Sequence, residues 1–152
     1  MRVVIQKVKS ASVSVEGKKI SEIKKGLMIL VGVEDKDNEE DMEWLSGKIV
    51  NMRIFENENG VMNRSVIDEK GDILMVSQFT LMASTKKGNR PSYIRASRGE
   101  VAKPIFDNIC AKTSEKLGRD VKKGVFGAMM DVEIINNGPT TIVMDTKNRE
   151  DW

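Results

Sequence analysis

The chain has 152 residues, of which 39% are hydrophobic and 32% are charged, and its formal net charge is +2. This length and balance fit one globular domain and exclude a disordered or collagen-like protein. No apolar run of membrane length and no secretory leader is found in the sequence, so we expect a cytoplasmic protein.

Histidine is absent from the sequence, and Cys110 is the single cysteine. These counts exclude a Ser-His-Asp or Cys-His arrangement and the usual zinc ligand sets within one chain. Cys110 falls at an apolar helical spacing and is interpreted as a core residue. We therefore expect no metal and no cofactor. Any proton transfer must use carboxylates, lysine, positioned water or the substrate.

Strands are predicted at residues 3–8 and 13–15, where apolar and polar side chains alternate, and again at residues 19–23. Residues 27–33 form a continuous apolar run, which is typical of a strand covered on both faces. Short spacers between these segments favour antiparallel hairpins.

Asp37 and Glu40 have the spacing of a capping pair, which predicts a helix from there to about residue 51. The residues that recur at helical spacing, and should pack on the sheet, are Met42, Leu45, Ile49 and Met52. Trp44 is interpreted as a packing anchor or a subunit contact.

Residues 73–77 read as a buried strand, after which the pattern becomes polar. Ser77, Gln78 and Thr80 place three uncharged hydrogen-bonding side chains around Phe79. A rigid strand that ends in polar residues is a common place for a site. Ordinary loop hydrogen bonds would explain the same residues.

Between residues 73 and 99 there is no acidic residue, and five basic residues occur. They are Lys86, Lys87, Arg90, Arg95 and Arg98. Because this stretch follows the polar strand end, its charge favours a phosphate-bearing ligand beside that site. Solubilising surface lysines are the alternative interpretation.

A second helix is predicted from Ser97, which forms an S-x-x-E capping pattern with Glu100, to a stop at Gly118. Its apolar face should contain Val101, Ile105, Ile109, Cys110, Thr113 and Leu117. Pro104 would lie inside this helix and bend it, unless the regular helix begins near Lys103.

Further strands are predicted at residues 121–126, 129–135 and 140–144, with a sharp turn at residues 136–139. Together, these predicted strands and helices indicate one α+β domain over residues 1–146, with a largely antiparallel, barrel-like sheet and two flanking helices. Residues 147–152 should form a loosely held charged tail.

Two motifs resemble the hallmarks of the D-aminoacyl-tRNA deacylase family. They are Ser77-Gln78-Phe79-Thr80 and Asn136-Asn137-Gly138-Pro139-Thr140-Thr141. The resemblance extends to residues 8–13, 31–33, 90–92 and 126–130, and only the end after about residue 145 is unmatched. It implies a homodimeric hydrolase that acts on aminoacyl-tRNA and releases D-amino acids, with glycyl-tRNA as a second substrate.

The resemblance also implies the roles of the motif residues. Backbone N–H groups of Phe79 and Thr80 would hold the carbonyl oxygen of the ester, helped by the 2′-hydroxyl of the RNA. Ser77 and Gln78 would orient the loop and the ribose.

For chirality, the resemblance implies that Gly138 and Pro139, joined by a cis peptide bond, reach into the partner's site and exclude L side chains. Phe126 and Met130 match positions of the adenine pocket, although plain strand packing remains open for Met130. Lys86, Lys87, Arg90 and Arg95 are candidate tRNA contacts.

The sequence departs from the family pattern at two positions. Lys7 stands where many relatives have arginine, and lysine lacks the forked contact of a guanidinium. Thr140 replaces a more usual valine.

Three alternatives stay open. They are a hydrolase with Thr80 as nucleophile, a non-catalytic RNA-binding module that uses residues 86–98, and a related deacylase with a trans Gly-Pro bond.

Overall fold

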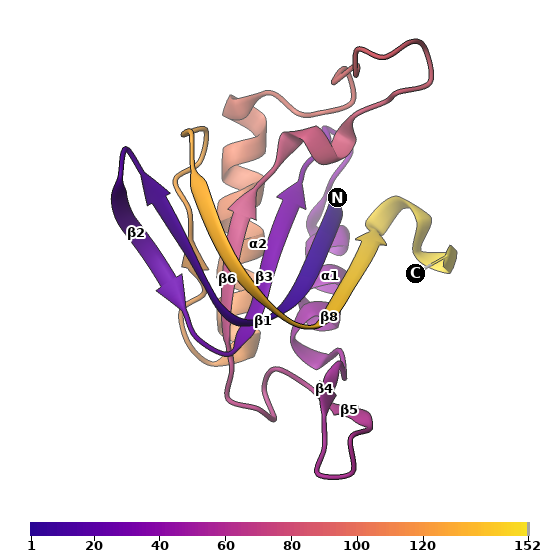
Figure 1. The fold of residues 1–152 in the computed structure, drawn as a ribbon. Helices are drawn as coiled ribbons and strands as arrows, with labels where there is room; N and C mark the ends of the chain where they lie inside the picture. Colours follow the sequence, from indigo (N-terminus) through magenta and orange to yellow (C-terminus); the bar gives the residue numbers. More distant parts are fainter. Residues whose placement is uncertain (152) are drawn as a thin grey trace.

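The computed structural model describes residues 1–151, and a curved sheet built around one long strand forms its centre (Figure 1). This strand, β1 (Arg2–Val15), pairs antiparallel with β3 (Gly26–Gly32) through its first half and with β2 (Lys18–Ile23) through its second half. On its other edge, β8 (Asp131–Asp145) pairs with most of its length, also antiparallel. The predicted antiparallel hairpins are confirmed here.

On the side of β3 away from β1, the strands of the sheet are parallel. β6 (Asp72–Ser77) lies parallel beside β3, and β7 (Lys122–Lys123) lies parallel beside β6. The prediction of a largely antiparallel sheet is confirmed, but it did not include this parallel edge, which arises because helical crossovers connect these strands. The Ser21 hydroxyl in β2 donates to the Lys123 carbonyl in β7 at 2.8 Å, so the sheet nearly closes into a barrel.

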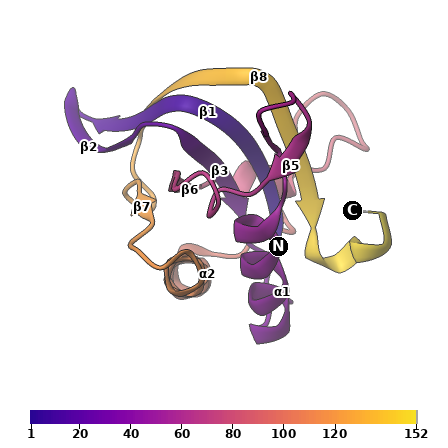
Figure 2. The same cartoon turned by 90° about the horizontal axis from the view of Figure 1, so that it is seen from below.

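Two helices flank the sheet, α1 (Glu39–Asn51) and α2 (Gly99–Leu117), as predicted. Figure 2 shows them on one side of the molecule, with β1 and β8 arching over the other. Two short 3-10 helices, η1 (Phe79–Met82) and η2 (Thr146–Asp151), follow β6 and β8. In the part of the chain that the structure describes, no helix combines the length and apolar character of a membrane span.

The small hairpin of β4 (Phe55–Glu56) and β5 (Met62–Arg64) stands apart from the main sheet. The core lies on both faces of β3 and β6. Ile29 and Met75 face the helices, where they meet Leu45 and Phe106, whereas Leu74 faces the interior of the barrel. Burial on both faces explains the continuous apolar runs of these strands.

The prediction of separate strands and a sharp turn near residues 136–139 is wrong, because β8 continues through this segment. Gln6 pairs with Thr141, and Val8 pairs with Asn136. Between these two pairs the segment of β8 is longer than the segment of β1, so β8 bulges away from β1. Local turn chemistry predicted a reversal, but pairing with the length of β1 keeps the strand continuous. The strand predicted at residues 121–126 shortens to β7.

Both predicted helix caps are corrected. Asn38, rather than Asp37, caps α1 in a box with Asp41, because the Asp37 carboxylate instead accepts from the Glu34 backbone N–H. Ser97 does not cap α2, since its hydroxyl donates to Asp35 at 2.5 Å.

The helix α2 begins at Gly99 and includes Pro104, which lies inside it as expected. Its buried face differs from the prediction at the N-terminal end. Val101 is 44% exposed, and Ala102 and Phe106 are buried instead.

The tail is not loosely held over its described part. In η2, Lys147 donates to Asp41, and Arg149 bonds both Asp41 and Glu40 of α1. The Arg149 guanidinium also lies 5.2 Å from the Trp44 ring centroid, and Trp44 packs partly buried against the core. Trp152 lies outside the described residues.

Candidate active site

The polar strand end forms a tight junction between β6 and η1. The Gln78 backbone N–H donates to the Val31 carbonyl at 2.8 Å, which continues the pairing with β3 beyond the end of β6. The chain then turns into η1. Within residues 1–151, the backbone N–H groups of Phe79 and Thr80 have no backbone acceptor, as is usual at the start of a helix.

Gly32, at the end of β3, lets η1 lie close to the sheet. A Cβ atom at this position would be 2.9 Å from the Leu81 Cβ and 3.1 Å from the Gln78 carbonyl oxygen. Only glycine leaves this space. Arg2 fixes η1 from another side, since its guanidinium donates to the Leu81 carbonyl at 2.8 Å and pairs with Asp145 of β8 at 2.9 Å.

The Thr80 hydroxyl accepts a hydrogen bond from the Gln78 side-chain amide at 2.5 Å. Within residues 1–151 the structure gives this hydroxyl no hydrogen bond with a lysine or a carboxylate. Part of the polar character of this strand end therefore serves local hydrogen bonding, as the alternative interpretation expected.

A cavity of about 530 Å³ opens beside this junction. Three predicted site residues, Ser77, Gln78 and Phe79, line it together with Phe126 and Met130. The other lining residues are Val31, Val33, Val76, Ser97, Gly99, Ala102, Gly127, Ala128, Met129 and Val132. None of these side chains is ionisable, so chemistry in this cavity depends on hydrogen-bond donors, a substrate group or water.

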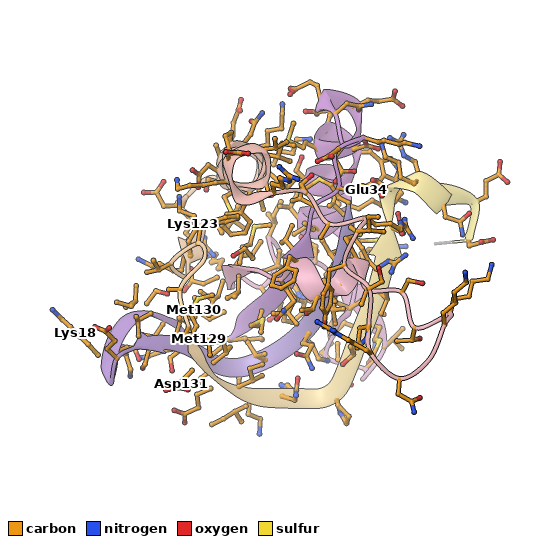
Figure 3. The ribbon with its side chains drawn as sticks, turned by 90° about the horizontal axis from the view of Figure 1, so that it is seen from above. Lys18, Glu34, Lys123, Met129, Met130 and Asp131 are labelled. Atoms are coloured by element: carbon orange, nitrogen blue, oxygen red, sulfur yellow. The ribbon has the colours of Figure 1, made fainter. Side chains whose placement is uncertain are left out.

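The wall of the cavity opposite η1 comes from the segment between β7 and β8. The Phe126 ring centroid is 5.9 Å from that of Phe106 in α2, which anchors this segment on the core. Figure 3 shows Met129 and Met130 on this side of the site and Glu34 on the opposite side. Met130 lines the cavity and also packs against the barrel interior, so strand packing accounts for part of its surroundings.

The structure does not bring Gly138 and Pro139 to this cavity in a single chain, since neither residue lines it. Their peptide bond is cis, whereas the third alternative required a trans bond. Gly138 has φ +127°, and the neighbouring Thr140 is buried. Lys7 is buried opposite the bulge, and its ammonium lies 5.9 Å from the Phe55 ring centroid.

The basic residues lie on a loop, residues 83–98, that projects beyond the sheet at the top of Figure 1. Lys86, Lys87 and Arg90 are exposed and form no ion pair with any other residue in the range 1–151. Arg95 pairs with Glu34 at 3.3 Å. None of the four lines the cavity.

Cys110 is buried in the core and does not line the cavity. Burial raises the pKa of its thiol to about 12, so the reactive thiolate is scarce near neutral pH. The interpretation of Cys110 as a core residue is confirmed.

Sequence reasoning missed several residues that line the cavity or lie next to it. Tyr93 packs edge-on against Phe79, and Ser97, Gly99, Ala128 and Met129 line the cavity. Gly32 and Arg2 position η1 from outside it. Since these contacts join segments far apart in the chain, no local pattern marks them. Two sequence signals pointed to the loop around Tyr93, namely its basic residues without any acidic residue and the family resemblance at residues 90–92.

The fold and site define a class: an α+β domain with a nearly closed sheet, whose strand end opens on an uncharged cavity sized for a small organic group. The profile of the D-Tyr-tRNA(Tyr) deacylase family matches residues 4–145. The chain belongs to this family.

Relatives named "D-aminoacyl-tRNA deacylase" from Bacteroides fragilis and Flavobacterium johnsoniae are each 57% identical over 150 residues, which cover 99% of this chain and 100% of theirs. Among solved structures, "c-Myc DNA Unwinding Element Binding Protein" is similar with a TM-score of 0.88 and 38% identity, covering 95% of this chain and 98% of that one. A probable eukaryotic D-amino acid tRNA deacylase, 19% identical with a TM-score of 0.80, shares the fold over 94% of this chain and 97% of its own.

Proposed function

We propose that the protein is a cytoplasmic editing hydrolase that cleaves the ester between a D-amino acid and the terminal ribose of tRNA. The observation that carries this proposal is the convergence of the S-Q-F-T strand end with Phe126 and Met130 on one uncharged cavity. Its volume, about 530 Å³, suits an adenosine with an attached amino acid. Membership of the family supports the same reaction.

Main-chain groups provide the catalysis. The N–H groups of Phe79 and Thr80 stabilise the carbonyl oxygen of the ester as it gains negative charge. The 2′-hydroxyl of the terminal adenosine directs a water molecule, which adds to the acyl carbon. The bond from that carbon to the ribose oxygen then breaks, and the proton from water passes to the ribose oxygen. Ser77 and Gln78 orient the loop and the ribose.

The adenine base lies in the apolar part of the cavity. Phe126 offers an aromatic face and Met130 a polarisable thioether, both of which suit a purine. The contact of Phe126 with Phe106 supports this role, because it holds the ring at the cavity wall.

Chiral selection comes from a second copy of the chain in a homodimer. Gly138 and Pro139 of one copy present backbone carbonyls to the substrate's α-amino group in the other copy's cavity, and crowd the face where an L side chain must project. Neither residue lines the cavity of its own chain, so this role requires the second copy. Glycine has no side chain to exclude, so glycyl-tRNA is a second substrate.

The projecting loop contacts the tRNA backbone. Lys86, Lys87 and Arg90 are exposed and available to phosphates. Arg95 contributes less to this surface, because its pairing with Glu34 offsets its charge and holds the loop instead.

Release of amino acid from matched D-tyrosyl-tRNA and L-tyrosyl-tRNA tests the proposal. We expect rapid release from the D ester and release at the uncatalysed rate from the L ester. An RNA-binding module would release neither, and this result would refute the hydrolase.

Thr80→Val tests the nucleophile alternative, because valine keeps the backbone N–H and removes the hydroxyl. We expect a loss in kcat of at most about fivefold, since one neutral hydrogen bond contributes about 1 kcal/mol. Loss of all deacylation, with an unchanged thermal unfolding curve, would instead assign Thr80 as a covalent nucleophile.

Arg2→Met tests whether the position of η1 matters for catalysis. The variant removes the donor to the Leu81 carbonyl and leaves the largely buried Asp145 unpaired. We expect a decrease in kcat of about tenfold with little change in KM, and partial recovery in Arg2→Lys.

Arg149→Met is the matched control for Arg2→Met. It also breaks an arginine–aspartate pair, but in the docking of η2 on α1. We expect it to lower stability without this kcat effect. An equal loss of kcat in both variants would show that Arg2 acts only through stability.

A further inference from the structure

Two aromatic side chains are exposed at the mouth of the cavity. Phe79 is 56% exposed and Tyr93 is 40% exposed, and their ring centroids lie 5.2 Å apart with an interplanar angle of 70°. Phe79 lines the cavity, whereas Tyr93 lies outside it. Aromatic rings that are left in contact with solvent beside a site offer faces for another planar group.

The loop that carries Tyr93 is fixed on both sides of it. Ser92 and Ser84 exchange two backbone hydrogen bonds of 2.8 and 2.9 Å, and the Ala96 N–H donates to the Tyr93 carbonyl at 3.0 Å. Farther along, the Ser97 N–H donates to the Val33 carbonyl at 3.0 Å. Tyr93 is therefore held next to Phe79 by the backbone rather than by the ring contact alone.

The charge around the pair indicates the chemistry of its partner. Residues 83–98 contain five basic residues and no acidic residue. Lys86, Lys87 and Arg90 are exposed, and within the range that the structure describes they have no ion-pair partner. Exposed rings beside unpaired cations match a single nucleic acid strand, whose bases stack and whose phosphates are anionic.

We propose that Phe79 and Tyr93 form a stacking platform for the base of the nucleotide that precedes the terminal adenosine of tRNA. This inference rests on the proposed function, which places the terminal adenosine in the cavity. The preceding base stacks on the exposed rings, and its phosphate turns toward the tip of the loop at Lys86, Lys87 and Arg90. Stacking tolerates any base, so the platform recognises an unpaired end rather than a sequence.

Tyr93→Leu tests the platform, because it removes the ring while an apolar side chain remains. We expect kcat/KM for D-tyrosyl-tRNA to fall about tenfold, mainly through KM, and hydrolysis of 3′-O-D-tyrosyl-adenosine to stay unchanged. Tyr93→Phe should match the wild type. Ile94→Ala is the control, because it truncates a 90% exposed apolar side chain on the same loop without removing a ring.

Tyr93 is the only tyrosine in the sequence, which allows a direct measurement. Incorporation of 3-fluorotyrosine gives one ¹⁹F resonance from this ring. We expect the dinucleotide CpA to shift the resonance and adenosine alone to leave it in place. A resonance that does not respond to CpA, or responds equally to adenosine, would overturn the platform.

The outcomes separate this inference from the proposed function. If the wild type hydrolyses neither ester, the proposed function fails, while the ¹⁹F titration still tests the platform. If the wild type hydrolyses both esters and Tyr93→Leu lowers both equally, only the platform fails. Dissociation of the Tyr93→Leu protein in analytical ultracentrifugation would assign the ring pair to contact with a second copy, which would also overturn the platform.

Discussion

Replacing Gly138 with alanine is expected to lower D-aminoacyl-tRNA deacylation at least about 100-fold in a chain that remains folded. Gly138 has φ +127°, and an added Cβ would be 2.8 Å from the Thr140 hydroxyl and 2.9 Å from its backbone nitrogen. The segment must therefore shift, and the backbone carbonyls that we propose to contact the substrate shift with it. Single-turnover release of D-tyrosine, with circular dichroism as the check of folding, measures the effect.

Gly17→Ala provides the matched control. Gly17 also lies in the left-handed region, with φ +77°, but a Cβ there would meet nothing within 4 Å. Gly17→Ala should lose about 1 kcal/mol of unfolding free energy from backbone strain, and Gly138→Ala should lose more because of the added contacts with Thr140. Only Gly138→Ala should lose activity, and equal activity in the two variants would contradict the role of residues 138–139.

Replacing Gly32 with alanine is expected to lower kcat about 10- to 100-fold with a smaller effect on KM. The new Cβ would push against the Leu81 Cβ and the Gln78 carbonyl, and would displace the start of η1. Because the proposed oxyanion donors are backbone N–H groups of this turn, their position decides the stabilisation of the transition state.

Gly47→Ala in α1 is the control for Gly32→Ala. Its Cβ would make only an ordinary contact of 3.7 Å with the Lys116 ammonium, and alanine favours the helix. We expect wild-type kcat from it. Normal kcat in Gly32→Ala would show that the position of η1 is not critical.

The parts of the fold that follow from local patterns could be predicted from the sequence. The apolar run at residues 27–33 indicated a strand covered on both faces, and the run at residues 73–77 indicated a buried strand; β3 and β6 confirm both. Gly-Pro at residues 138–139 misled the prediction, because it is typical of a turn while the pairing of β8 with β1 is set by distant residues. Asp37 and Ser97 misled it for the same reason, since the Asp37 carboxylate pairs with the N-terminal ammonium of Met1 and the Ser97 hydroxyl donates to Asp35.

The site was predictable in its chemistry but not in its surroundings. Ser77, Gln78 and Phe79 were marked by the change from apolar to polar at the strand end, and the family resemblance added Phe126 and Met130. Their meeting at one cavity required the structure. Arg2 and Gly32 contact η1, and Tyr93 meets Phe79 from outside the cavity. These contacts join segments far apart in the sequence, so no local pattern revealed them.

The most direct test of the central claim, that each site is completed by main-chain groups of the other copy, is subunit complementation. Gly138→Ala and Gly32→Ala chains carrying different tags are co-expressed, and mixed dimers are purified through both tags. If residues 138–139 act on the partner's cavity, one site in each mixed dimer is intact, and about half of the wild-type activity returns. Mixed dimers as inactive as either parent, or no recovery of mixed dimers at all, would contradict the claim.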